Sequence, residues 1–327
     1  MTRAHLRRIT GLVVGIGVAC WVGCGQRIDA PHESPFALII PPPDSYVQLY
    51  ERLGFDSATD LDLARGGLLY VSSMVNGVTP FYQSVLRGPG WPFEDLVDPA
   101  VVAEAPNGDI LVGDRGDMHV KVYEADGGAP RVTFTDSLWA EFGGIAADDS
   151  GNIYVADAES SFVRAYRPDG TPRFSGQHLA DRGFGLGHVM EPHGLFFDGE
   201  DLWIADTGKN WVQKVSTREI QLGLAFLDGY THTYVGQDSL DNTVEYEIKI
   251  SFSSPMDVAT DTEGFVYVAD RGNRRIFKFD DKMASFTMVN YDTLMSQPPG
   301  LRAIGVSDTR VYAIDDSLGA ILVWELK

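Results

Sequence analysis

SPMDVATDTEGFVYVADRGNRRIFKFD, residues 254–280, is the stretch that decides the fold of this chain. Apolar and aromatic residues run through 256–259, 265–269 and 275–279, and the residues between them are rich in Asp, Gly and Asn. This pattern is typical of three short strands joined by tight turns. Because one such unit cannot bury both faces of its sheet, the stretch predicts that copies of it pack against one another.

Further copies are recognised by the residue at the centre of the middle strand. These centres recur roughly every 40 to 65 residues, at Tyr70, Leu111, Tyr154, Trp203, Tyr267 and Tyr312. An aspartate follows three residues later in all but the first copy, as Asp114, Asp157, Asp206, Asp270 and Asp315. Repeats of this length with several strands each predict an all-β fold, a six-bladed β-propeller.

The repeat resembles the NHL repeat, whose pattern is Pro-x-Gly-Ile-Ala-Val-Asp, Gly-x-Ile-Tyr-Val-Ala-Asp and Asn-x-Arg-Ile. Residues 255–279 and 142–166 fit this pattern closely, and the resemblance extends over about residues 58–327. It implies a six-bladed propeller of NHL type. It does not specify an activity, because one fold carries many unrelated sites.

The two ends of the chain are expected to meet in the last blade. The sixth repeat ends with its third strand at residues 321–327, so no residues remain for a fourth. Residues 45–50 have the alternating pattern of a strand. An unpaired outer edge would promote aggregation. We therefore expect the N-terminal strand to complete the last blade and close the ring.

Three segments depart from the repeat. Residues 218–253 contain two alternating runs around a polar turn and predict a long outer hairpin. Residues 74–81 are expected to form an extended loop in the first blade. Residues 177–190 form a Gly- and His-rich connection, and such loops on a rigid scaffold are where specificity usually resides.

The N-terminal residues 1–23 are typical of a signal peptide, with three arginines before an apolar segment too short for a stable membrane span. Val-Gly-Cys at 22–24 resembles the bacterial lipobox, which implies cleavage before Cys24 and its acylation. An ordinary signal peptide or an uncleaved anchor is the alternative. Residues 24–43 are a Pro-containing tether, and residues 44–327 are the propeller domain.

The composition restricts the kinds of partner and the cellular location that are expected. Both cysteines, Cys20 and Cys24, lie in the signal region, so the exported domain has none for a disulfide or a thiolate metal site. The net charge of −20 argues against nucleic acid as a partner and against electrostatic attachment to anionic lipid. We expect a monomer in the bacterial cell envelope, held by N-terminal acyl chains. Gly25 after Cys24 favours the outer membrane, facing the periplasm, by resemblance to enterobacterial sorting.

The candidate ligand site lies at the mouth of the channel. In a propeller, the starts of the innermost strands and the turns between second and third strands lie on one face. The strand starts contribute His193, Asp257, Arg302 and Asp60, and the turns contribute Arg115, Lys209 and Arg271. The recurrent aspartates are instead expected to cap turns by accepting backbone hydrogen bonds.

The residues 192–195, Pro-His-Gly-Leu, resemble an element of the peptidyl-amidating lyases, propellers that hold zinc with histidines from several blades. Only His193 carries over, and zinc needs three or four ligands. A related calcium-dependent hydrolase would need a channel ring of acidic and amide side chains, for which only Asp60 and Asp257 are candidates. The sequence therefore favours a non-catalytic, cofactor-free propeller that binds a protein, peptide or small molecule. The alternative is a metal-dependent lyase or hydrolase centred on His193.

Overall fold

The computed structural model describes residues 46–55, 57–82, 85–86, 93–237, 243–280, 286–289 and 300–326. The predicted signal peptide, Cys24 and the tether lie outside these residues. Nearly all regular structure in the described part is β-strand, interrupted by the short 3-10 helices η1 (Thr207–Lys209) and η2 (Arg271–Asn273). This confirms the all-β prediction. No helix among the described residues is long and apolar enough to cross a membrane.

Each repeat forms one antiparallel sheet, numbered here by repeat. Sheet 1 contains β2 (Ala58–Leu63), β3 (Leu68–Ser73), β4 (Gly77–Tyr82) and β5 (Val85–Leu86). Sheet 2 contains β6 (Pro99–Glu104), β7 (Ile110–Asp114), β8 (His119–Glu124) and β9 (Gly127–Phe134). Sheet 3 contains β10 (Phe142–Ala147), β11 (Ile153–Asp157) and β12 (Phe162–Tyr166). Sheet 4 contains β15 (Pro192–Phe197), β16 (Leu202–Asp206), β17 (Trp211–Val215) and β18 (Gly223–Leu227). Sheet 5 contains β21 (Pro255–Thr260), β22 (Val266–Asp270), β23 (Arg275–Phe279) and β24 (Phe286–Val289). Sheet 6 contains β25 (Leu301–Val306), β26 (Arg310–Asp315), β27 (Ala320–Leu326) and β1 (Tyr46–Gly54).

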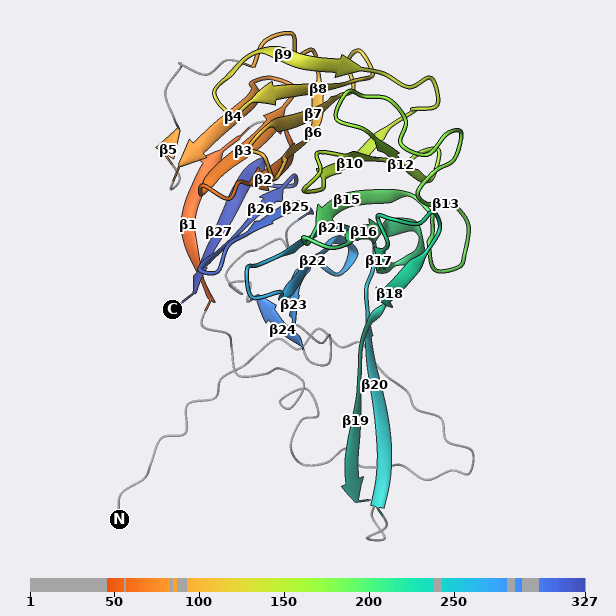
Figure 1. Ribbon diagram of the computed structural model, residues 1–327. Helices are drawn as coiled ribbons and strands as arrows, with labels where there is room; N and C mark the ends of the chain where they lie inside the picture. The colour runs from red at the N-terminus through yellow and green to blue at the C-terminus, as the bar shows by residue number, and fades with distance from the viewer. Residues whose placement is uncertain are drawn as a thin grey trace, which may run out of the picture.

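The first strands of the sheets contact one another in chain order around a centre, and β25 contacts β2 (Figure 1). In sheet 6, β1 pairs with β27, with Tyr46 opposite Leu326 and Leu49 opposite Val323. The N-terminal strand thus occupies the outer position that the sequence predicted. The two ends of the folded chain lie side by side as a result.

The aromatic centres of the repeats are buried between neighbouring sheets. Tyr154 and Tyr267 are 0 % exposed and Trp203 is 2 % exposed. Such side chains bury a large apolar area, so the repeat pattern in the sequence is the pattern of the core.

The recurrent aspartates accept hydrogen bonds from the backbone of the following turn, as predicted, for example Asp114 from the N–H of Gly116 at 3.0 Å. They also bind the chain that leads into the first strand of the sheet. Asp114 is 0 % exposed and accepts hydrogen bonds from the backbone N–H groups of Val97 and Asp98, both at 2.8 Å. It therefore ties the chain that enters β6 to the end of β7. Asp206 holds the N–H of Met190 in the same way at 2.8 Å. These carboxylates are buried links between strands.

The departures from the repeat also appear in the structure. β19 (Gly229–Gln237) and β20 (Thr243–Ser251) form the predicted hairpin, which projects from β18 away from the sheets (Figure 1). The predicted extended loop at 74–81 is wrong, because residues 77–82 pair with β3 as β4. Within the connection 177–190, the short strands β13 (Asp181–Arg182) and β14 (His188–Val189) pair in parallel.

Candidate ligand-binding site at the mouth of the channel

One face of the molecule carries the starts of the first strands together with the ends of the second strands. Pro192 lies opposite Asp206, Pro99 opposite Asp114 and Pro255 opposite Asp270. The structure thus brings the strand starts and the following turns, from which the predicted site residues come, to the same face. We call it the mouth face.

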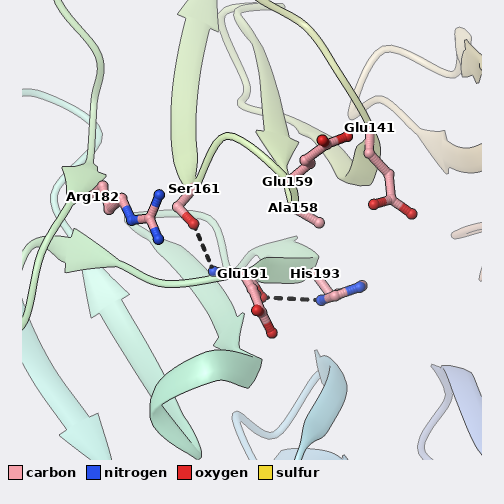
Figure 2. A pocket seen from close by; sticks show the side chains of 7 residues that line it. All are labelled: Glu141, Ala158, Glu159, Ser161, Arg182, Glu191 and His193. Carbon is pink, nitrogen blue, oxygen red and sulfur yellow. Dashed lines mark hydrogen bonds between the residues drawn. The ribbon is translucent and has the colours of Figure 1, made fainter.

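A pocket of about 330 Å³ opens on the mouth face between sheets 3 and 4. Its lining comes from the strand starts, from the turn after β11 and from β13 (Figure 2): Glu141, Ala158, Glu159, Ser161, Arg182, Glu191 and His193. The three glutamates and Arg182 are exposed. We call this the mouth pocket. Among the predicted residues, only His193 belongs to it.

The side chain that follows the recurrent aspartate explains why the pocket lies here. In sheet 2 this position is Arg115, whose Nε donates to Asp98 at 2.8 Å. In sheet 3 it is Ala158, which is too small to fill the space or to pair with Glu141. No salt bridge within the described residues involves Glu141, Glu159 or Glu191. Arg115 of the neighbouring sheet lies close enough to Glu141 for their charges to interact. The position after the aspartate in sheet 3 itself supplies no cation, so it leaves both space and exposed negative charge.

The hydrogen bonds of His193 define its tautomer. Nδ1 lies 3.0 Å from the carbonyl oxygen of Glu191 and 3.0 Å from Oγ1 of Thr207. A carbonyl only accepts, and the Thr207 hydroxyl donates to the Pro255 carbonyl at 2.6 Å, so Nδ1 carries the proton. The lone pair is then on Nε2, the ring nitrogen that points away from Glu191 in Figure 2.

Burial lowers the pKa of His193, and the positive charge of Arg302 lowers it further. The neutral ring is therefore the favoured form near neutral pH. In this form Nε2 can accept a hydrogen bond or a proton from a bound molecule. The backbone of Glu191, with φ of 52°, is fixed by its N–H, which donates to Oγ of the buried Ser161 at 3.1 Å.

Asp60, Asp257 and Arg302 lie deeper, on the channel wall of sheets 1, 5 and 6. Oδ2 of Asp257 accepts from the N–H of Ile304 at 2.7 Å, and Oδ2 of Asp60 accepts from the N–H of Val102 at 2.9 Å. Nε of Arg302 donates to the Thr59 carbonyl at 2.6 Å, again on the next sheet. The innermost strand of a sheet has one edge without a partner strand, and these side chains satisfy backbone groups on that edge.

The channel carboxylates influence one another. Burial raises the pKa of Asp60 to about 7, and burial raises the pKa of Asp257 well above its ordinary value, with repulsion from Asp60 adding to the effect. Arg302 opposes the shift at Asp60. The structure therefore brings these three predicted residues together electrostatically, although their oxygens and guanidinium bond to backbone.

The two predicted arginines of the turns form ion pairs at the rim of the mouth face, which is the ring of turns that follow the second strands. Arg115 pairs with Asp98, and Arg271 pairs with Asp316 at 2.6 Å. The predicted Lys209 is largely buried and donates to the His188 carbonyl at 2.6 Å. Within the part of the chain that the structure describes, no group of three or more His, Cys, Asp and Glu side chains is arranged to hold a metal ion.

Sequence reasoning missed the glutamates of the pocket, although a signal was present. Glu141 and Glu191 each stand directly before the first strand of their repeat, the position that Asp98 has in the second repeat. An acidic residue at this position in three successive repeats would have indicated an acidic arc on the mouth face.

The family model for the NHL repeat matches residues 252–279. The protein is an NHL-type β-propeller. A search of curated protein sequences gave no match.

Solved structures resemble this NHL-type propeller over most of its length. A streptogramin B lyase is 13 % identical with a TM-score of 0.57 and covers 86 % of this chain and 97 % of its own. A catalytically inactive His-to-Ala variant of virginiamycin B lyase from Staphylococcus aureus with quinupristin is 10 % identical, with a TM-score of 0.54, covering 86 % of this chain and 99 % of its own. A nidogen/laminin complex is 15 % identical with a TM-score of 0.51 over 71 % of this chain and 83 % of the other. At these identities the likeness shows the fold alone.

Proposed function

We propose that this NHL-type propeller is a binding protein that takes a positively charged ligand or protein segment into the mouth pocket. The observation that carries the proposal is the set of exposed carboxylates of Glu141, Glu159 and Glu191 around a pocket of about 330 Å³, in which Arg182 is the one cation among the lining residues. Carboxylates recognise guanidinium and ammonium groups by charge-assisted hydrogen bonds. Nε2 of His193 adds a neutral acceptor for an N–H group of the same ligand.

The residues of the channel wall hold the sheets that carry this pocket in fixed positions. Asp60, Asp257 and Arg302 fix the innermost strands to one another, and Arg115 and Arg271 fix the rim through their aspartate partners. A rigid frame keeps the pocket residues in place before the ligand arrives, which reduces the entropy lost on binding. The proposed function needs no cofactor.

The test uses tetra-arginine amide as the probe and tetra-citrulline amide, its uncharged analogue, as the control ligand, with affinity measured by calorimetry. Glu141→Gln and Glu191→Gln should each weaken tetra-arginine binding by about tenfold, as expected for loss of a charged contact. Glu263→Gln changes an exposed glutamate in the turn before β22, at the other end of the sheet, and should leave affinity unchanged. Equal affinity for both peptides, or equal loss in all three variants, would overturn the proposal.

A second candidate is a lyase or hydrolase in which His193 removes a proton. The specific observation is the tautomer: Nδ1 is held by Glu191 and Thr207, and the lowered pKa keeps Nε2 able to accept a proton. Two of the structures with this fold are a streptogramin B lyase and a virginiamycin B lyase. Metal content of the purified protein, measured by mass spectrometry, separates the metal-dependent form of this candidate from the binding proposal: stoichiometric zinc or calcium would favour the enzyme.

The proposal places the protein in the bacterial cell envelope, anchored through acyl chains on Cys24 and facing the periplasm as a monomer. Each buried CH₂ of an acyl chain contributes about 0.8 kcal/mol, so several chains give stable anchoring. Cys24→Ala should abolish labelling by a clickable fatty acid and release the exported protein from membranes. Cys20→Ala is the matched control, and equal labelling in wild type and Cys24→Ala would refute the anchor.

A further inference from the structure

A group of exposed apolar side chains lies beside the mouth pocket. Phe184 is 81 % exposed, and the others are 38 % to 45 % exposed: Leu186, Leu222, Leu224 and Phe226. We call these five residues the apolar patch. Single exposed apolar residues are ordinary on protein surfaces, but a cluster of them marks an interaction site.

The two segments that carry the patch touch each other. Leu224 and Phe226 alternate on the exposed side of β18, and the ring of Phe226 lies 4.6 Å from that of Trp211. Leu186, from the connection to β14, packs directly on Gly223: a Cβ at Gly223 would lie 2.7 Å from Cβ of Leu186. Gly223 thus allows the connection to lie against the outer strand, which joins the two halves of the patch.

The connection that carries Phe184 is held firmly. Nζ of Lys209 donates to the Gly185 carbonyl at 3.0 Å and to the His188 carbonyl at 2.6 Å. The buried Gln213 accepts from the N–H of Gly187 at 3.1 Å and donates to the same His188 carbonyl at 2.6 Å. An exposed aromatic ring on a fixed backbone is a preorganised anchor for a partner.

The same segment connects the patch to the mouth pocket. Arg182 lines the pocket two residues before Phe184, and Glu191 lines it at the other end of the connection. A partner that covers Phe184 therefore reaches the pocket beside Arg182, and the carboxylates of Glu141 and Glu159 lie on the other side of the same pocket (Figure 2).

We infer that the apolar patch and the mouth pocket form one surface for an amphipathic, basic segment of a partner protein. The inference rests on the proposed function and specifies its ligand. The apolar side chains of the partner cover Phe184 and its neighbours, and an arginine or lysine of the same segment enters the pocket. Charge complementarity selects this occupant: the pocket is acidic and the chain carries a net charge of −20, which repels an anionic lipid surface.

Fluorescence polarisation with two labelled peptides tests the inference. One peptide repeats Arg-Leu-Phe and the other repeats Glu-Leu-Phe, so that they share apolar side chains and differ in charge. We expect the Arg peptide to bind more tightly, and Phe184→Ser to weaken it by about tenfold while leaving tetra-arginine binding unchanged. Val75→Ser, which alters a side chain 68 % exposed on sheet 1, is the matched control and should change neither.

The outcomes separate the inference from the proposed function. If Glu191→Gln weakens both Arg-containing peptides and Phe184→Ser weakens neither, the pocket binds cations and the inference about the patch fails. If neither variant has an effect, both fail. Sedimentation with phosphatidylcholine vesicles that is lost in Phe184→Ser, without a change in peptide affinity, would assign the patch to lipid. A wild-type dimer that Phe184→Ser converts to a monomer would assign it to a second copy. Either result would overturn the inference.

Discussion

The mouth face uses the same backbone positions differently over sheets 5 and 6 than over sheets 3 and 4. Over sheets 5 and 6, the residues that follow the recurrent aspartates are Arg271 and Asp316, and they pair at 2.6 Å. Over sheets 3 and 4 the same positions hold Ala158 and Thr207. Thr207 binds a backbone carbonyl of the next sheet, and Ala158 leaves the mouth pocket open.

The backbone does not account for this difference. Pro192 and Pro255 have the same register against Asp206 and Asp270. The repeat supplies a constant frame, and a change of side chain at one repeated position turns a paired rim into an acidic pocket. Four predictions test or refine this contrast.

Removing a buried aspartate of the mouth face should cause the largest loss in the free energy of unfolding. Nζ of Lys121, whose side chain is 3 % exposed, lies 2.7 Å from Oδ2 of Asp114. Asp114→Ala should lower the free energy of unfolding by about 3–5 kcal/mol, because it leaves a buried charge with less compensation. Glu141→Ala removes an exposed carboxylate and should cost no more than about 0.5 kcal/mol. Urea unfolding measures both, and similar midpoints would contradict the contrast.

The channel wall should make stability depend on pH. Burial raises the pKa of Asp60 to about 7 and of Asp62 to about 6, from an ordinary value of 3.8. Raised carboxyl pKa values stabilise the fold below the unfolded pKa, and this contribution is lost as the pH rises through the folded values. The free energy of unfolding should therefore fall by about 2–4 kcal/mol between about pH 5 and pH 8.

Asp60→Asn should flatten that profile, because an amide oxygen can still accept from Val102 and does not titrate there. The lowered pKa of His193 acts in the opposite direction, since its contribution to stability is lost as the pH falls below the unfolded value. His193→Gln measured beside Asp60→Asn separates the two effects. A profile that Asp60→Asn leaves unchanged would count against the channel assignment.

Filling the open position should abolish the pocket. Ala158→Arg places in sheet 3 the residue that pairs with an aspartate in sheet 2, and its guanidinium would compensate Glu141. We expect binding of tetra-arginine amide to weaken at least about tenfold, equal to about 1.4 kcal/mol. Ala158→Ser is the control that fills little space and adds no charge. Undiminished binding in Ala158→Arg would show that the ligand lies elsewhere.

Removing the ion pair between Arg271 and Asp316, over sheets 5 and 6, should have the smallest effect on the free energy of unfolding. The pair of Arg271 and Asp316 is partly exposed, with side chains 34 % and 29 % accessible. Arg271→Ala should lower the free energy of unfolding by about 0.2–1 kcal/mol, as for other accessible pairs. Thermal melts at low and high salt provide the measurement. A loss of several kcal/mol that is insensitive to salt would mean that the pair holds the ring together.

The sequence predicted the architecture well because the information is local and repeated. Alternating residues define each strand, turn residues end it, and the buried centres such as Tyr154 and Tyr267 recur with the repeat. Counting the strands of the last repeat was enough to predict where β1 pairs. The loop expected at residues 74–81 was wrong because strand pairing with β3 outweighed its turn-forming residues.

The candidate site was predicted only in part. The sequence indicated the mouth face and His193, because the strand starts and turns of a repeated unit must lie at the same end of each sheet. It could not show that Asp60 and Asp257 bond to backbone groups 42 and 47 residues away, on the next sheet. Those bonds depend on how the unpaired edge of one innermost strand faces the side chains of its neighbour.

The amino-acid sequence by itself thus determined the repeats, the strands within them and the face on which polar residues gather. Only the tertiary structure decided which of those residues form hydrogen bonds and ion pairs between sheets and which line a pocket. Glu141, Ala158 and Glu191 come from two repeats, and the space among them exists only after sheets 3 and 4 have packed. A pocket is a property of side chains that neighbouring sheets bring together, and no spacing within one repeat encodes it.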